Sequence, residues 1–352
     1  MNCVRSQLDN GKNVLGLYLD LKKAFGTVDH SILLEKLLHY GIRGKAHSII
    51  SSYLKNRKQC VYVNNTFSSY SEVSTGVPQG SVLGPLLFLI YINDISNAVP
   101  NTSARLFADD TNIFLSDRNC TGLIQKGVHT LSKLHDWFDS NKLTLHLGKT
   151  TYSIFHSSTK AHSCCNSFAF KDSIINKSSS TKYLGLIIDD KLSWVDHTND
   201  LCNFLTKYTG IFYQLKDLLP QKTALHMYYA FVFSKLRYAV EIYGTAKSSV
   251  LMPLQVLQNK LLKLLTGKTR YYPTKQLYHE YELFMLNDIH FYCMCQIIYK
   301  YCNDMIPYAI STAIFPERNL ILNRPMAVST RNRDLFAVSH HNTPNAWQIF
   351  VE

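Results

Sequence analysis

The sequence contains no apolar run long enough to span a membrane. Its longest such run, residues 82–92, is interrupted by Gly84 and Pro85 and falls short of the roughly 20 residues that a transmembrane helix needs. The amino terminus also lacks the charged and then apolar pattern of a secretory signal peptide. These two absences predict an intracellular, soluble chain.

Cysteines show no regular spacing. Nine occur among 352 residues, and this odd number argues against a disulfide scaffold and for a reducing compartment. A zinc site is disfavoured as well, because neither Cys164-Cys165 near His162 nor the group formed by His290, Cys293, Cys295 and Cys302 has a paired C-x₂-C spacing.

Acidic residues are scarce relative to basic ones. The chain has 25 Asp and Glu against 37 Lys and Arg, a formal charge of +12. Residues 191–275 carry twelve basic and four acidic side chains, whereas residues 1–150 carry sixteen and eleven. Such an excess favours a polyanionic partner, either nucleic acid or an acidic membrane surface.

The hydrophobic pattern predicts a folded α+β region followed by a helical one, with no internal repeat. Hydrophobic residues make up 46% of the chain and charged residues 18%, which is typical of folded proteins. We expect strands at 14–19, 143–147, 152–156 and 183–188, a hairpin at 59–74, and helices near 46–56, 81–93 and 124–141. A further helix is expected to begin near Asp29 or Ser31, both favourable caps, and to end at Gly41, and Ser81 is expected to cap the helix at 81–93. Helices near 201–215, 222–243, 254–266 and 282–302 follow. The helix at 46–56 is expected to bury Ile49, Ile50, Tyr53 and Leu54.

Asp109 and Asp110 lie between two short apolar runs, 106–108 and 113–115, a pattern that predicts a β-hairpin with both carboxylates at its turn. Adjacent carboxylates repel each other and resist burial, so they need a neutralising partner. Mg²⁺ suits this role because it prefers hard oxygen ligands. An ordinary polar turn is the alternative interpretation, since Asp189-Asp190 also follows an apolar run.

Asp20 ends the apolar strand at 14–19, about ninety residues before the pair. If the two segments are neighbours in one sheet, three carboxylates converge at one edge of it. Three carboxylates suit two Mg²⁺ ions, which in two-metal sites lie roughly 3.5–4 Å apart and clamp the attacking and leaving oxygens of a phosphoryl displacement.

Five motifs, in order, resemble those of reverse transcriptases of non-LTR retrotransposons, and in particular of jockey-like long interspersed elements. They are residues 18–25; residues 75–81 with 83–88; residues 107–110; Trp137 with 141–143 and 149–150; and residues 182–185 followed by Leu192, Trp194 and His197. The resemblance covers roughly residues 10–270. It implies a right-hand palm at 1–190 with an antiparallel sheet and helices, an all-helical thumb at 191–270, and a helical extension with an irregular tail at 271–352.

The resemblance also implies a ligand set. Asp20, Asp109 and Asp110 would be the catalytic residues that hold two Mg²⁺ ions, with Mn²⁺ as a possible substitute. The backbone carbonyl of Leu21 would contact a metal ion or the triphosphate.

The resemblance implies substrate-binding roles for four further residues. Phe25 occupies the family's sugar-gate position, where a ring under the incoming sugar excludes a 2′-hydroxyl. Gln79 and Gly80 would line the nascent base pair, where a glycine lets the backbone approach closely. Lys149 would neutralise or protonate the pyrophosphate leaving group, and a solvated surface lysine is the alternative. The basic helical region would grip the template–primer duplex by its phosphates.

The implied function is RNA-directed DNA polymerisation, a nucleotidyl transfer that copies element RNA from a nicked-target primer. Its partners would be an RNA template, a DNA primer and dNTPs, with no membrane, in the nucleus and in a cytoplasmic ribonucleoprotein. Because Met1 falls just upstream of the first motif, the fingers, endonuclease and other parts of the retrotransposon polyprotein are expected to be missing from this chain.

Two residues depart from the family pattern. Gly26 stands where an aspartate is usual, and His146 stands where an asparagine is usual. Together with the missing fingers, Gly26 motivates an alternative: a catalytically inactive remnant that only binds RNA or template–primer. A third interpretation is an α+β protein whose motifs are coincidental.

Overall fold

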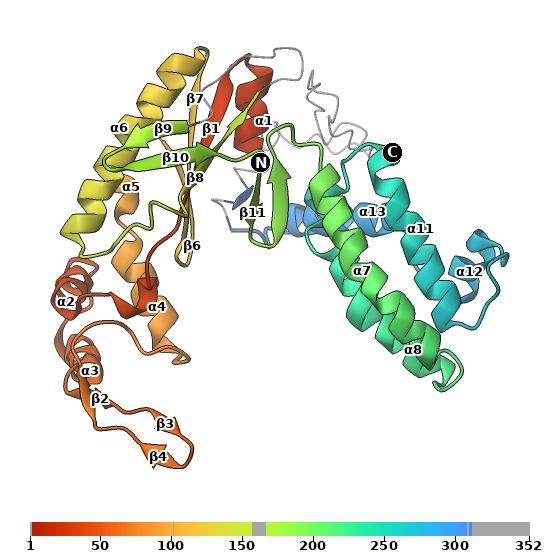
Figure 1. Ribbon diagram of the computed structural model, residues 1–352, viewed down its shortest axis with the longest axis horizontal. Helices are drawn as coiled ribbons and strands as arrows, with labels where there is room; N and C mark the ends of the chain where they lie inside the picture. The colour runs from red at the N-terminus through yellow and green to blue at the C-terminus, as the bar shows by residue number, and fades with distance from the viewer. Residues whose placement is uncertain (1, 101, 157–166, 308–309, 312–352) are drawn as a thin grey trace, which may run out of the picture. The chain divides into compact units, whose positions relative to one another are not determined.

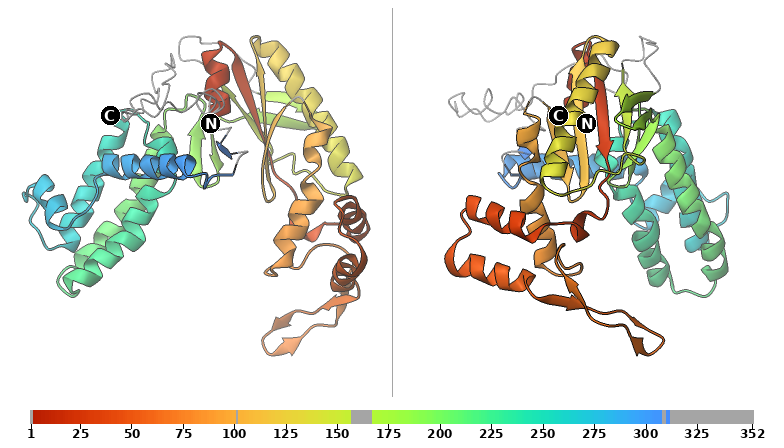
Figure 2. Two further views of the ribbon diagram at one scale, coloured as in Figure 1. Left: turned by 180° about the vertical axis from the view of Figure 1, so that it is seen from behind. Right: turned by 60° about the vertical axis from the view of Figure 1, so that its left-hand side comes forward.

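The chain forms two compact units (Figures 1 and 2). The computed structural model describes residues 2–100, 102–156, 167–307 and 310–311. Residues 10–179 make up one unit, and residues 2–9 join the chain from Ser180 onward in the other. Sheets and helices occur together, which confirms the α+β fold class. The division at Ser180 lies ten residues before the palm boundary expected at 190.

A mixed six-stranded sheet is the centre of the first unit. Its strands run in the order β6-β7-β1-β8-β10-β9, and all neighbours are antiparallel except β8 and β10. They are β1 (Asn13–Leu19), β6 (Ser103–Phe107), β7 (Asp110–Asp117), β8 (Thr151–Phe155), β9 (Ser167–Phe170) and β10 (Ser173–Lys177). All seven residues of β1 are buried, as its nearly continuous apolar sequence predicts for a central strand.

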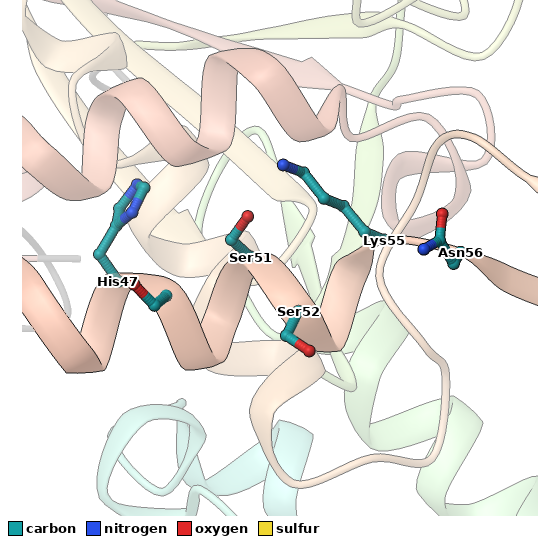
Figure 3. A pocket seen from close by; sticks show the side chains of 6 residues that line it. His47, Ser51, Ser52, Lys55 and Asn56 are labelled. Carbon is teal, nitrogen blue, oxygen red and sulfur yellow. The ribbon is translucent and has the colours of Figure 1, made fainter.

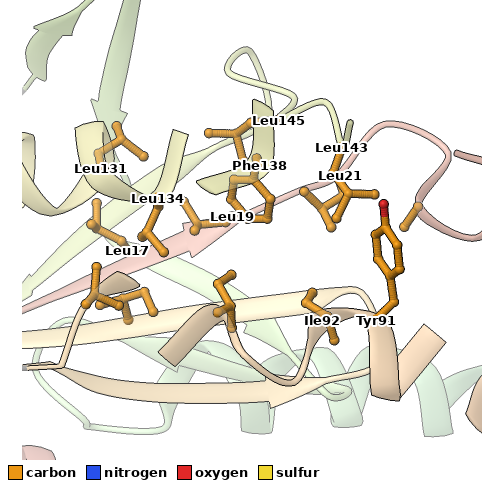
Figure 4. Packing of buried hydrophobic residues seen from close by; sticks show 14 of the residues in the cluster. Leu17, Leu19, Leu21, Tyr91, Ile92, Leu131, Leu134, Phe138, Leu143 and Leu145 are labelled. Carbon is orange, nitrogen blue, oxygen red and sulfur yellow. The ribbon is translucent and has the colours of Figure 1, made fainter. Parts of the chain in front are cut away.

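Six helical segments pack on the sheet or beyond its end and complete the core of the unit. They are η1 (Ala24–Gly26), α2 (His30–His39), α3 (Gly44–Leu54), α4 (Leu83–Ile92), α5 (Ile95–Ala98) and α6 (Cys120–Ser140). The apolar stripe of α6 packs against β1, so that Leu17 and Leu19 lie among Leu134 and Phe138 (Figure 4). The sheet end that carries Asp20 is thereby held on a rigid, fully buried layer.

The predicted hairpin at 59–74 is confirmed as a two-part arm that projects from the helices (Figure 2). Its strands are β2 (Arg57–Gln59), β3 (Tyr62–Val63), β4 (Thr66–Phe67) and β5 (Ser71–Val73). Asn64 and Asn65 have φ of 48° and 58°, the positive values that a two-residue type I′ turn requires.

One expectation for α3 is wrong. Leu54 is fully buried and Ile50 and Tyr53 pack against the core as predicted, but Ile49 is 66% exposed. Successive helical positions are rotated by about 100°, so Ile49 lies to one side of the stripe that the other three form.

The strand expected at 143–147 is also wrong. Only an isolated bridge joins Leu145 to Leu21, although the backbone N–H of Lys22 donates to Thr144 O (2.9 Å) and that of His146 donates to Asp20 O (2.8 Å). The alternation of apolar residues here reflects burial of Leu143 and Leu145 beneath the segment that follows β1, without a regular ladder.

The second unit begins with a hairpin where the sequence predicts a single strand at 183–188. Strands β11 (Ser180–Tyr183) and β12 (Leu186–Asp189) pair antiparallel. Leu184 and Gly185 form the two-residue turn between them, with φ of 47° and 81°. Glycine adopts positive φ without strain, so Gly185 favours this turn. The prediction of a single continuous strand is therefore wrong, although most of the residues concerned are in β-strands.

Helices form most of the rest of the second unit, as predicted for residues 191 onward, whereas the helix at residues 2–9 was not predicted from the sequence. They are α1 (Asn2–Asp9), α7 (Val195–Leu215), α8 (Gln221–Met227), the π-helical η2 (Tyr228–Phe233), α9 (Ser234–Arg237), α10 (Val240–Tyr243), α11 (Ser248–Leu265), α12 (Thr274–Glu280) and α13 (Leu286–Cys302). The helix expected at 222–243 is interrupted at Tyr238 and Ala239, where Ala239 has φ of 55°. An irregular tail is expected beyond Ile306, and its residues 308–309 and 312–352 lie outside the described residues.

Asp189 has a structural role. Its buried carboxylate accepts hydrogen bonds from the backbone N–H groups of Lys191, Ser193 and Trp194, at 3.1, 2.9 and 2.8 Å. These bonds hold a loop in which Leu192 and Trp194 have positive φ. The Asp189-Asp190 pair thus differs in its setting from Asp109-Asp110, although the two pairs look alike in sequence.

No helix in the described part of the chain is both long and apolar enough to cross a membrane. Of the cysteines that the structure describes, six are free thiols: Cys3, Cys60, Cys202, Cys293, Cys295 and Cys302. Cys120 is disulfide-bonded, a state that a reducing compartment does not favour. The zinc candidates at 162–165 lie outside the described residues.

Candidate catalytic site

Three carboxylates lie at one end of the central sheet. Strands β1 and β7 are adjacent and antiparallel, with Leu19 paired to Thr111, so Asp20 leaves β1 where Asp110 begins β7. Asp109 lies in the tight turn between β6 and β7, next to Ala108 with φ of 50°. Residues ninety positions apart are therefore neighbours because of strand pairing.

The three carboxylates interact electrostatically. Burial raises the pKa of Asp110 above its ordinary value, and the negative charges of Asp109 and Asp20 raise it further. The Nζ atom of Lys149 lies 3.7 Å from an Oδ atom of Asp20, but both side chains are exposed to solvent and this pair contributes little to stability. The site consequently carries uncompensated negative charge.

The carboxylates fit a divalent metal by chemistry and by position. Oxygen donors of this kind are what Mg²⁺ prefers, and a cation would relieve the repulsion that raises the pKa of Asp110. Among the residues that the structure describes, no three His, Cys, Asp or Glu side chains are already gathered closely enough to hold a metal ion. Side-chain rotation would therefore have to accompany binding.

The raised pKa of Asp110 has a consequence for stability. Between the ordinary aspartate pKa of about 3.9 and the raised value, the folded chain holds a proton that the unfolded chain has lost, so stability falls as pH rises through this window. We expect Asp110→Asn to raise the free energy of unfolding of the metal-free protein at pH 7. The gain should shrink towards pH 4, as measured by urea denaturation with chelator present.

The exposed carboxylate of Asp136 on α6 provides the control. Asp136→Asn should show no such pH-dependent gain. A destabilisation by Asp110→Asn that is equal at every pH would contradict the electrostatic account, because it would indicate lost packing instead of relieved repulsion.

The first motif continues into η1, which presents Phe25. The Phe25 ring is half-buried and stacks on Phe88 of α4, with ring centroids 4.6 Å apart. Leu21, by contrast, is buried in the core, so that only its backbone is left for a ligand. A Cβ atom on Gly26 would meet nothing nearer than Lys23 Cβ at 3.9 Å, so the usual aspartate has room at this position.

Backbone contacts lock the loop of the second motif onto η1. The N–H groups of Gly76 and Val77 donate to Val28 O (2.7 Å) and Phe25 O (2.8 Å). A Cβ atom on Gly76, where φ is +86°, would lie 2.9 Å from both Cα and O of Gly26. Only glycine permits this approach, so the position of Phe25 depends on the neighbouring loop.

Gln79 and Gly80 lie at the exposed tip of that loop. Gly80 has φ of +78°, and the N–H of Ser81 donates to Pro78 O at 3.4 Å, which forms a type II turn. Ser81 Oγ accepts from the N–H of Gly84 (2.9 Å) in the first turn of α4, although the N-cap residue is Val82 and not the predicted Ser81. The Gln79 side chain is therefore solvent-accessible on a loop that is fixed at both ends.

Sequence reasoning missed a linkage that involves Asp29. Asp29 caps α2 by accepting from the N–H groups of Ser31 and Ile32, and its second oxygen lies 2.6 Å from Lys142 Nζ. Burial opposes its ionisation, but the hydrogen bonds, that from Lys142 above all, hold the pKa of Asp29 well below its usual range. Only the capping role was visible in the sequence.

Tyr91 extends this linkage. Its hydroxyl donates to Asn141 O at 2.5 Å, and the backbone N–H of Asp29 donates to the same hydroxyl at 3.4 Å. Residues of the fourth motif are thereby connected to the segment that follows the first. The structure thus brings together all the motifs that fall within this unit.

Comparisons with known proteins agree with this arrangement. The family profile described as reverse transcriptase (RNA-dependent DNA polymerase) matches residues 2–188. The RNA-directed DNA polymerase from mobile element jockey of Drosophila melanogaster is 25% identical over 298 residues, covering 82% of this chain and 32% of that protein. The probable RNA-directed DNA polymerase from transposon X-element of the same organism is 26% identical over 261 residues, 71% of this chain and 28% of that protein.

A solved telomerase structure from Candida albicans, in complex with a fragment of telomeric RNA, covers 81% of this chain and 54% of its own chain. Its identity is 10% and its TM-score is 0.44, values too low to support a functional inference. The chain spans about a third of the length of the curated relatives that it matches. Since the family profile matches more than half of its residues, the chain belongs to the reverse transcriptase (RNA-dependent DNA polymerase) family.

Proposed function

We propose that this chain is the RNA-directed DNA polymerase part of a non-LTR retrotransposon. The observation that carries the proposal is the meeting of Asp20, Asp109 and Asp110 at one end of a sheet. In the same unit, the loops that carry Phe25 and Gln79 are locked to each other. We assign the unit of residues 10–179 to the palm and the helical unit to the thumb with its extension.

The three carboxylates would hold two Mg²⁺ ions, with Mn²⁺ as a substitute. When bound, such ions supply charge stabilisation to the oxygens of the phosphoryl group that is transferred. Phe25 would limit the space beneath the incoming sugar, and the backbone of Leu21 would contact the triphosphate. Gln79 and Gly80 would face the nascent base pair, and exposed Lys149 would neutralise the departing pyrophosphate.

The partners that follow are an RNA template, a DNA primer and dNTPs. The named activity of the jockey and X-element relatives supports this choice. Because those proteins are about two and a half times as long as this chain, the full cycle would also need the other parts of the polyprotein. Such a cycle would place the protein in the nucleus and in a cytoplasmic ribonucleoprotein.

Incorporation of dNTPs on a primed RNA template tests the proposal. We expect Mg²⁺-dependent extension that chelation abolishes, and slower use of NTPs than of dNTPs because of Phe25. Measuring the chain on primed RNA and primed DNA, with template alone as a control, separates templated synthesis from terminal addition.

The alternative function is an inactive remnant that only binds RNA or template–primer. This alternative predicts that the chain binds the primed template in a salt-sensitive way but does not extend the primer, whether Mg²⁺ or Mn²⁺ is supplied. That outcome would contradict the proposed activity. If Gly26→Asp then restored extension, the defect would be assigned to this position, where the structure leaves room for a side chain.

A further inference from the structure

A long segment of the first unit has no acidic residue. Between Glu35 and Glu72 the chain contains six Lys and Arg and neither Asp nor Glu. Lys36 is neutralised by Asp94 at 2.6 Å. The other five form no salt bridge with any residue that the structure describes: Arg43, Lys45, Lys55, Arg57 and Lys58. Helix α3 and the arm of β2–β5 therefore form a surface of positive charge.

Aromatic rings are exposed on the same arm. Tyr62 and Phe67 are directly opposed in β3 and β4, with ring centroids 4.4 Å apart, and they are 56% and 67% exposed. Tyr70 is 73% exposed and directly precedes β5, the strand that returns to the helices. Exposed π faces beside unpaired cations are the combination with which proteins bind unpaired nucleobases.

The tip of the arm is held in one conformation. Tyr62 Oη donates to Asn65 Oδ1 (2.9 Å) across the type I′ turn, and the N–H of Ser68 donates to Val61 O (2.9 Å). The N–H of Val61 donates in turn to Ser68 Oγ (2.9 Å). An aromatic pair that is fixed in this way loses little conformational entropy when a ligand stacks on it.

Helix α3 adds a polar hollow at the base of the arm (Figure 3). Its volume is about 380 Å³, and its lining is formed by His47, Ser48, Ser51, Ser52, Lys55 and Asn56. His47 Nε2 is hydrogen-bonded to Leu34 O at 3.2 Å, and Ser48 Oγ donates to Gly44 O at 3.2 Å. Ser51, Ser52, Lys55 and Asn56 are left to face a ligand. Hydroxyl and ammonium donors of this kind suit phosphate oxygens.

We propose that the arm and α3 bind single-stranded nucleic acid, namely the unpaired part of the RNA template. Bases would stack on the Tyr62–Phe67 pair and on Tyr70, while Lys55 and Lys58 would contact phosphates. Unpaired bases are required because the π faces of a duplex are already stacked. This inference extends the proposed polymerase function, but binding is measured without metal or nucleotide, so the two can fail separately.

Fluorescence anisotropy of a labelled single-stranded RNA 20-mer with the whole chain tests the inference. We expect Tyr62→Ala with Phe67→Ala to raise Kd about tenfold through lost stacking. Lys55→Gln with Lys58→Gln should weaken binding and reduce the salt slope by about 0.7 for each lysine. Single-stranded DNA of the same sequence should show the same two losses, because it offers the same bases and phosphates.

Two matched variants in the same unit serve as controls. Ile174→Ala removes an equally exposed apolar side chain from β10, and Lys133→Gln removes an exposed charge from α6. Neither should change Kd by more than about twofold. Because all the altered arm side chains are exposed, thermal melting should be unchanged, and Tyr70→Ala provides an independent stacking variant.

Either of two results would overturn the proposal. One is RNA binding by the double aromatic variant with the affinity of the parent. The other is that the double aromatic variant loses as much affinity for a blunt duplex as it does for single-stranded RNA. That result would show that the arm does not recognise unpaired bases. If the chain bound single-stranded RNA as expected but did not extend a primer, the proposed polymerase function would fail while the inference about the arm would stand.

Discussion

Asp109→Asn is expected to lower dNTP incorporation by about a thousandfold or more, without loss of folded structure. The side chain lies in the turn between β6 and β7, next to Asp110, and its charge contributes to the raised pKa of that neighbour. Asparagine preserves the shape but removes the negative charge that would attract a divalent cation. Removing one of three negative charges also reduces the electrostatic repulsion in the metal-free site. We therefore expect the free energy of unfolding to be unchanged or slightly increased.

Single-nucleotide extension on primed RNA, with urea denaturation in parallel, measures both effects. Asp190→Asn is the matched control because it alters the second member of the other Asp-Asp pair, which lies in the helical unit beside the structural Asp189. We expect this control to extend primers at the parent's rate. Equal rates for Asp109→Asn and the parent would remove Asp109 from the site and leave the role of the sheet end unexplained.

Local pattern was sufficient for much of the sheet and site. The apolar run at 14–19 predicted a buried central strand, and Asp109 and Asp110 were expected at a hairpin turn. These inferences succeeded because strand burial and turn chemistry are encoded within a few residues. The approach of Asp20 to that pair was conditional on the two segments being neighbours in one sheet, a long-range pairing that only the structure shows. The roles assigned to Asp20, Asp109 and Asp110 stay predictions until they are measured.

Features that depend on distant contacts could not be predicted in this way. The hairpin of β11 and β12 was read as one strand, since Leu184 gives no local sign that it adopts positive φ. The exposure of Ile49 depends on which face of α3 packs against the core. The apolar residues of the helix locate that face only to within one residue. The contact between Gly26 and Gly76 joins segments fifty residues apart and has no signature beyond two glycines.

That contact predicts the second large effect. Gly76→Ala would place a Cβ atom 2.9 Å from backbone atoms of Gly26, at a residue whose φ is +86°. The left-handed conformation costs an alanine about 1–2 kcal/mol, and overpacking against an immobile backbone adds about 1–3 kcal/mol. We expect the free energy of unfolding to fall by about 3 kcal/mol. Because η1 must shift, Phe25 would move relative to Asp20, and a displacement near 1 Å would lower extension about a hundredfold.

Gly41→Ala separates the two causes. Gly41 has nearly the same φ, +84°, but a Cβ atom there would meet nothing within 4 Å. This control should lose only the conformational part, about 1–2 kcal/mol, and should extend primers at the parent's rate. If Gly76→Ala behaved like Gly41→Ala in both urea denaturation and extension, the loops would not be rigidly joined. A selective loss in Gly76→Ala would instead show that the second motif positions the first, so that the Phe25 ring and the loop of Gln79 behave as one element.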